Sequence, residues 1–292
     1  MPLADQAAPK FRQLRMKSLP RMGSSAHAAG FIIVGVIVLC AIFADVISPH
    51  NPAFADPFNK FLPMFSPCHP LGTDELGRDL LSRLIHGGRF ALFVAVVPTL
   101  IALVVGGLIG LLSGYVGGFL DSFIMRVFDV MFSFPGILLA LGISAALGAG
   151  TQSMLIAMVV VTVPEFGRVL RGTVLSVKEE PYIESALTLG IGHWRIAIRH
   201  VVPNILSPIT VLAAMQTGNN VILAASLSFL GLGAQPPTAD WGSMLGGGRG
   251  AMISAPHVAT LSGLAIVILA IGFNLIGDAV RDRLDPNMQK GS

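Results

Sequence analysis

Charged residues are scarce in this sequence of 292 residues, of which only 12% are Asp, Glu, Lys or Arg. Soluble domains contain about 25% charged residues, and so few charges cannot cover a water-soluble globule of this length. Apolar residues make up 53% of the chain and the mean hydropathy is +0.74, which indicates lipid as the surrounding medium. The same apolar content excludes disorder for most of the chain.

Cysteines and catalytic motifs are also few. Cys40 lies in an apolar segment and Cys68 in a polar one, and two cysteines cannot form a disulfide framework. No His-Glu-x-x-His pattern occurs, and the only Lys followed by Ser or Thr, Lys17, lacks the preceding Gly of a Walker A loop. We therefore expect no catalytic residue, no bound metal and no cofactor in this chain.

Long charge-free segments mark the expected membrane spans, because a spanning helix needs about 20 mostly apolar residues. Three intervals between charges accommodate one helix each, namely 21–45, 89–121 and 249–278. The interval 129–165 is too long for one helix and contains a turn-forming cluster at 148–153, so we expect two helices there. One more helix is expected from Ile205 to Leu232. The sequence thus predicts an all-α membrane protein with six transmembrane helices.

Basic residues predict the orientation of these spans. Five of them precede the first span: Lys10, Arg12, Arg15, Lys17 and Arg21. Cytoplasmic loops are enriched in Lys and Arg, so an even number of spans places both termini in the cytoplasm. The loop 172–204 then faces inward, and residues 46–89 and 233–257 face outward. A cleavable signal peptide is the alternative for the first span. Because the basic residues flank apolar segments, they do not indicate a nucleic-acid partner.

Four glycines recur every four residues in the second span: Gly106, Gly110, Gly114 and Gly118. Small residues at this spacing let two helix backbones approach closely in lipid. The contact is either within the helix bundle or between subunits, and the sequence does not distinguish the two.

The inward loop predicts two short helices joined at a glycine. Acidic residues precede Pro181, which suits a first helical position, and Gly190 suits the left-handed end of that helix. A second helix is expected from His193, halted by Pro203. Such a unit either fits a groove of a partner protein or lies on the bilayer surface.

The motif in this loop resembles the Glu-Ala-Ala loop of ABC importer permeases. Glu184, Ser185 and Ala186 are followed by Gly190, and the motif closes at His200 and Pro203. Ser185 replaces the usual Ala, and His200 is similar to the peptide-importer branch. The outer run from His69 to Asp79 resembles the dipeptide, oligopeptide and nickel permeases, and Phe134-Pro135 and the run 229–233 extend the resemblance over nearly the whole chain.

The resemblance implies the type I ABC importer permease fold with a cytoplasmic coupling helix, in a bacterial inner membrane. A second homologous permease would complete the passage, and two ATP-binding subunits, which hold ATP and Mg, would grip the inward loop. A periplasmic solute-binding protein would deliver a peptide. Six residues are implied in ATPase coupling: Glu184 as polar anchor, Ala186 as close-approach position and Gly190 as elbow, together with Ser185, His200 and Pro203.

Other functions remain open on the same sequence. The same branch imports nickel, glutathione or opine-like solutes, and the rivals from other classes are an ion-driven carrier and an intramembrane enzyme. We divide the chain into a cytoplasmic segment 1–29, a first helix with its outer segment 30–89, a core of five helices 90–280 and a cytoplasmic tail 281–292.

The outer segment after Gly72 is expected to form an amphipathic helix, with Asp79 and Arg83 paired four residues apart. Its charged face either docks the binding protein or faces water; the residues in question are Asp74, Arg78, Asp79 and Arg83. A metal site of His69, Asp74 and Asp79 is an alternative, and we prefer surface charge.

Polar residues interrupt the fifth span: Gln216, Thr217, Asn219 and Asn220. Polar groups surrounded by lipid need partners. We therefore expect these side chains either to line the passage or to form hydrogen bonds between helices.

Overall fold

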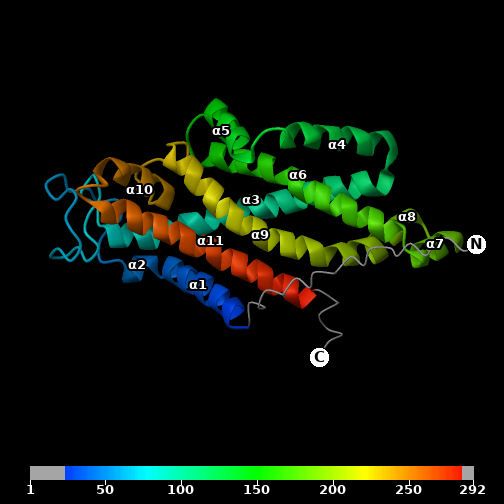
Figure 1. Cartoon of the computed structure of the whole chain (residues 1–292), viewed down its shortest axis with the longest axis horizontal. Coiled ribbons are helices and arrows are strands. Elements are labelled where there is room, and N and C mark those ends of the chain that lie inside the picture. Colours follow the sequence, from blue (N-terminus) through cyan, green and yellow to red (C-terminus); the bar gives the residue numbers. More distant parts are fainter. Residues whose placement is uncertain (1–23, 285–292) are drawn as a thin grey trace, which may run out of the picture.

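The computed structural model describes residues 24–284, whose regular elements are helices, with no strand among them (Figure 1). The spanning candidates are α1 (Ser24–Ile42), α3 (Leu80–Val116), α6 (Thr151–Lys178), α9 (Val202–Phe229) and α11 (Pro256–Leu284). The shorter helices are α2 (Ala44–Ile47), α4 (Gly118–Phe132), α5 (Gly136–Leu147), α7 (Pro181–Thr188), α8 (His193–Ile196) and α10 (Trp241–Gly248). A π-helix, η1 (Ala197–Val201), joins α8 to α9, and a 3-10 turn, η2 (Arg249–Ala251), follows α10. The basic residues before the first span lie outside the described residues.

Five helices of the described chain are long and apolar enough to cross a membrane, and α4 with α5 makes a sixth span if the bent pair counts as one. The two helices expected in the interval 129–165 are present, with the predicted turn between α5 and α6. The first of them is bent by 90° between α4 and α5. Pro135 lies at this break and cannot donate the backbone hydrogen bond that would continue α4.

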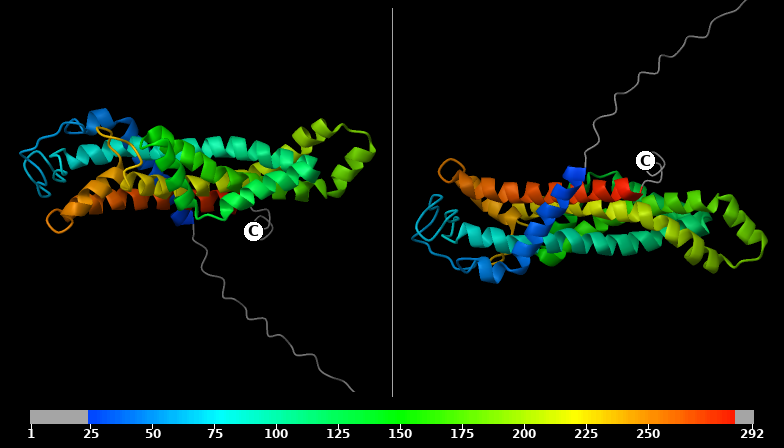
Figure 2. Two further views of the ribbon diagram at one scale, coloured as in Figure 1. Left: turned by 90° about the horizontal axis from the view of Figure 1, so that it is seen from above. Right: turned by 90° about the horizontal axis from the view of Figure 1, so that it is seen from below.

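The helices form an elongated bundle. The loops of residues 48–79 and α10 lie at one end of its long axis, and α7 with α8 lies at the other (Figures 1 and 2). The start of α1 lies beside the end of α11, where His27 Nε2 is 3.4 Å from an oxygen of Asp282. Both ends of the described chain therefore lie on the same side of the bundle, as an even number of passes predicts.

Helices α3 and α6 pack closely through the glycine repeat. A Cβ atom at Gly110 would lie 3.0 Å from the Cα of Gly167, and one at Gly114 would lie 3.0 Å from the Cβ of Val174. A Cβ at Gly118, by contrast, would meet nothing within 4 Å. Three of the four predicted glycines thus serve a helix contact within the chain.

Two predicted helix boundaries are wrong. The helix expected after Gly72 begins only at Leu80 and continues without a break into the second span, which gives α3 its 37 residues. Pro203 does not halt a helix, because it lies in the first turn of α9, where a missing N–H costs nothing. Residues 241–248, expected within an outer loop, form α10.

Candidate functional site

The unit formed by α7, Gly190 and α8 lies at the tip of the bundle. The backbone N–H of Ile191 donates to the carbonyl oxygen of Ala186 at 3.1 Å, which is the closing hydrogen bond of a Schellman motif. Gly190 has a φ of +77°, a conformation that costs other residues about 1–2 kcal/mol. The left-handed elbow predicted at Gly190 is confirmed as a geometry, and its role in coupling stays a prediction.

Helix α7 has one buried and one exposed face. Ile183 and Ala186 are buried in the apolar core shared by α3, α6 and α9, whereas Glu184 and Ser185 are exposed. Glu184 and Ser185 are therefore available to a partner. Ala186 faces the bundle, so the close approach that its small side chain allows is to the chain's own helices and not to a partner.

Tyr182 ties α7 to the start of α9. Asn204 Nδ2 donates to the carbonyl oxygen of His200 at 2.6 Å and to the hydroxyl of Tyr182 at 3.3 Å. The rings of Tyr182 and His200 lie with their centroids 6.0 Å apart. His200 thus belongs to a junction between the two helices, and the exposed Pro203 lies next to it. No sequence pattern predicts the role of Tyr182, because its hydrogen-bond partner lies 22 positions away.

Ionic contacts join α6 to its neighbours below this unit. Lys178 Nζ donates to the carbonyl oxygen of Tyr115 at 2.9 Å, at the end of α3. Arg171 donates to both carboxylate oxygens of Asp121 at 2.5 and 2.6 Å, and Arg168 lies 2.5 Å from Asp129. Arg168 and Asp129 thus pair between α6 and α4. The end of α6 is therefore attached to both α3 and α4.

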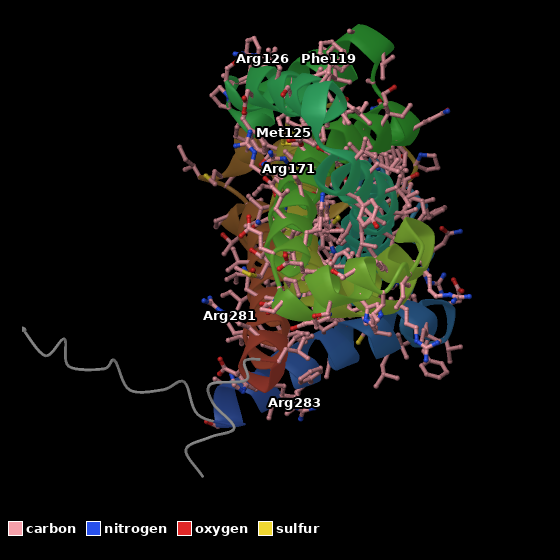
Figure 3. The ribbon with its side chains drawn as sticks, turned by 90° about the vertical axis from the view of Figure 1, so that its right-hand side faces the viewer. Phe119, Met125, Arg126, Arg171, Arg281 and Arg283 are labelled. Atoms are coloured by element: carbon pink, nitrogen blue, oxygen red, sulfur yellow. The ribbon has the colours of Figure 1, made fainter. Side chains whose placement is uncertain are left out.

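Figure 3 looks along the long axis of the bundle, from the end that holds α7 and α8, and shows where these contacts lie. Figure 3 shows Arg171 beside α4, whose residues Met125 and Arg126 are labelled above it. Arg281 and Arg283 of α11 lie at the opposite edge of the molecule (Figure 3). The α4 contact and the end of α11 are thus on separate faces of the bundle.

The four charged residues of the outer segment are buried, which contradicts the exposed charged face expected from the sequence. Asp74 is fully buried, and Arg78, Asp79 and Arg83 are each at most 5% exposed. One carboxylate oxygen of Asp74 accepts a hydrogen bond from Arg78 Nε at 2.7 Å and lies 3.2 Å from Arg83 Nε. These side chains hold the outer segment together, and they cannot present their charges to a binding protein or to water.

The expected pairing of Asp79 with Arg83 is also wrong. Asp79 caps α3, where its Oδ2 accepts from the backbone N–H of Ser82 at 2.8 Å. Arg83 instead reaches Asp74 and donates to the carbonyl oxygen of Pro52 at 3.0 Å. Asp79 and Arg83 lie four residues apart, but they do not pair with each other. Asp79 bonds to the first turn of α3, and Arg83 bonds to the distant loop at Pro52.

Helix α10 covers the outer end of the bundle. Its cap, Asp240, accepts hydrogen bonds from the backbone N–H groups of Gly242 and Ser243 at 3.1 and 3.3 Å. Burial raises the pKa of the Asp240 carboxyl, and these hydrogen bonds oppose the shift. Trp241 is buried and its Nε1 donates to the carbonyl oxygen of Leu84 in α3 at 2.8 Å. Neither Asp240 nor Trp241 was predicted from the sequence.

Of the polar residues on α9, Asn220 forms a hydrogen bond to another helix, and the lining of a passage stays a prediction. Asn220 is buried and its Nδ2 donates to Thr99 Oγ1 of α3 at 2.8 Å, while Thr217 bonds within its own helix to the carbonyl oxygen of Ala213. Asn219 is exposed, and its Nδ2 donates to Oε1 of the buried Gln216 at 2.6 Å. Helix-to-helix bonding therefore accounts for Asn220, and of the four residues Asn219 is the exposed one.

Comparison with known families decides between the classes of membrane protein. Residues 106–290 match the model of the binding-protein-dependent transport system inner membrane component. The chain belongs to this family. Residues 27–67 also match the N-terminal transmembrane domain of oligopeptide transport permease C. An inner membrane location, a helical permease fold and a role as a transport component are thereby established, as the sequence predicted.

Two relatives cover most of the chain. It is similar to the glutathione transport system permease protein GsiD of Pectobacterium atrosepticum, with 41% identity over 90% of this chain and 87% of that protein. The protein of the same name from Escherichia coli is 44% identical over 92% of this chain and 88% of its own length. The predicted branch of ABC importer permeases is confirmed, because the matched relatives are permeases of this type.

Proposed function

We propose that this chain is the permease subunit of an ATP-driven peptide importer and forms half of its passage. A second homologous permease forms the other half, two ATP-binding subunits with ATP and Mg lie on the cytoplasmic side, and a periplasmic binding protein delivers the substrate. Both termini are cytoplasmic. The observation that carries the proposal is the exposed face of α7, with Glu184 and Ser185, on a helix whose other face is packed into the bundle.

Coupling follows from these contacts. A movement imposed on Glu184 and Ser185 displaces α7 as a rigid unit, because Ile183 and Ala186 on its other face are packed in the core. The hydrogen bonds of Asn204 carry the displacement of α7 into α9. When α6 moves as well, the contacts of Lys178 carry its displacement into α3. A closure of the ATPases thus favours one of two bundle arrangements, as alternating access requires.

The test of this coupling is the elbow. Gly190→Pro fixes φ near about −65°, whereas the elbow needs +77°, so we expect ATP-driven uptake to be lost while the chain stays in the membrane. Glu184→Lys should have the same effect by reversing the charge offered to the ATPase. Gly192→Ala is the matched control, because a Cβ there meets nothing within 4 Å. Unchanged uptake with both Gly190→Pro and Glu184→Lys contradicts the coupling role.

We propose glutathione or a short peptide as the substrate, since the relatives are named for glutathione transport. Uptake of radiolabelled glutathione, a dipeptide and nickel by cells carrying the complete transporter distinguishes these candidates. Sensitivity of uptake to vanadate excludes an ion-driven carrier, and uptake by the purified chain alone contradicts the need for ATPase partners. Opine-like solutes are tested by competition in the same assay.

A further inference from the structure

Three side chains with metal-ligating atoms converge beside the start of α3. The candidate ligand atoms of His50, His69 and Asp79 all lie within 4.8 Å of one another. The three residues come from separate turns of the outer segment, at the end of the bundle opposite to α7 (Figure 1). What this cluster binds is therefore independent of the proposed coupling to ATPases.

The imidazoles of the cluster are positioned but incompletely satisfied. His69 Nδ1 lies 2.9 Å from Asp79 Oδ1, and the His50 ring stacks on that of His69 with centroids 4.8 Å apart. Nδ1 of His50 is buried and has no hydrogen-bond partner among the described residues. A buried nitrogen without a partner is unfavourable, and a ligand at this position would satisfy it.

Ser82 fixes two of the three residues relative to each other. Oδ2 of Asp79 accepts from the backbone N–H and the hydroxyl of Ser82 at 2.8 and 2.7 Å, which leaves Oδ1 directed at His69. The hydroxyl oxygen of Ser82 also accepts from the backbone N–H of His50 at 3.1 Å. Groups that orient the ligating residues in this way are typical of metal sites.

We propose that His50, His69 and Asp79 bind one zinc ion. Two imidazoles and a carboxylate are ligands that zinc accepts, and bonds of about 2.1 Å in a tetrahedron put ligand atoms about 3.4 Å apart. The ligand atoms, which lie within 4.8 Å of one another, would move to this spacing when the ion binds. His69 takes the tautomer with its proton on Nε2, and the ion replaces the proton shared with Asp79. Water fills the fourth position.

The ion ties the beginning of the outer segment to its end. Within the described structure, residues 48–79 contain isolated bridges but no helix and no strand. A segment without regular structure gains more from a metal than a packed helix does. Zinc joining His50 to Asp79 thus stabilises the region from which α3 starts.

The test uses the full-length chain in detergent micelles, without a histidine tag and stripped of metal with EDTA. Calorimetric titration with zinc should give one site per chain, and cobalt should give the visible absorption of a tetrahedral site with nitrogen and oxygen ligands. Zinc should also raise the temperature of unfolding. A folded chain that shows no saturable zinc binding overturns the proposal.

Variants assign the binding to these residues. His50→Phe keeps the stacked ring and removes its nitrogens, and Asp79→Asn keeps a side-chain oxygen for the helix cap. We expect each to weaken zinc binding by at least about tenfold, while unfolding in EDTA stays as in the unmodified protein. His27→Phe, at the start of α1, is the control and should bind zinc unchanged. If the His50→Phe and Asp79→Asn variants bind zinc as tightly as the unmodified protein does, the assignment is contradicted.

Discussion

Asn220 is a buried polar residue on a membrane-spanning helix, and its amide bonds to Thr99 of α3. Hydrogen bonds between transmembrane helices contribute about 0.6 kcal/mol on average and up to about 1.7 kcal/mol. We therefore expect Asn220→Ala to lower the free energy of unfolding by about 1 kcal/mol, measured by unfolding in mixed micelles. A double-mutant cycle with Thr99→Val isolates the pair, and independent effects of the two changes would contradict the hydrogen bond.

Asp74 is the centre of a buried ionic network with Arg78 and Arg83. Asp74→Ala removes the carboxylate that both buried guanidinium groups share and leaves Arg78 only the contact with Glu75. Breaking a buried pair costs about 3–5 kcal/mol. We expect a large fall in the thermal unfolding midpoint of the purified chain. The control is Asp45→Ala, which removes an exposed carboxylate paired with Arg89 and should shift the midpoint little. Equal shifts in the two variants would show that the network is not a stabilising one.

The difference between Gly190 and Asp74 shows what residue patterns predict. The elbow at Gly190 depends on local conformation, which glycine signals in the sequence, and the structure has the predicted positive φ. The surroundings of Asp74 and Arg83 depend on Pro52, which lies 31 residues from Arg83 along the chain. A projection of one helix considers only the residues of that helix. It therefore places charged residues on an exposed face and takes no account of partners elsewhere in the chain. The sequence therefore could not predict that these charges are buried.

Contact between α3 and α6 is the most extensive helix pairing among the described residues, and it depends on small residues. Gly110→Ala puts a Cβ 3.0 Å from the Cα of Gly167, so the helices must separate. We expect a loss of about 1–3 kcal/mol, the usual cost of overpacking, in the free energy of unfolding. Gly172→Ala in α6 meets nothing within 4 Å and should stabilise by about 0.5–1 kcal/mol through helix propensity. A destabilisation by Gly172→Ala as large as that by Gly110→Ala would contradict the proposed packing.

Hydropathy does not reveal where a helix is broken or bent. Charge-free intervals predict the long helices, but Pro98, Pro164 and Pro208 lie inside continuous helices whereas Pro135 lies at a bend of 90°. Neighbouring helices can satisfy the backbone groups that a proline frees. Proline alone therefore does not distinguish a span from a bent pair. In the bent pair, α4 contacts α6 through the hydrogen bond of Asp121 with Arg171.

For the whole molecule, charge distribution was enough to predict the number of passes, and family resemblance was needed to predict the coupling unit. The pairing of His27 with Asp282 agrees with an even number of passes. Physical reasoning alone left the inward loop equally suited to a partner groove and to the bilayer surface. The structure shows why both fitted, since α7 is amphipathic and its apolar face is covered by the chain's own core.

The proposed function requires that α7 and the outer segment lie on opposite sides of the membrane, with α7 in the cytoplasm. Ser185 is exposed on α7, and the native Cys68 is exposed in the outer segment. In a Cys40→Ser background, a membrane-impermeant maleimide applied to intact spheroplasts should label Cys68. With Cys68→Ser and Ser185→Cys, the same reagent should label only inside-out vesicles. Labelling of the introduced thiol from the outside of intact spheroplasts would contradict the account.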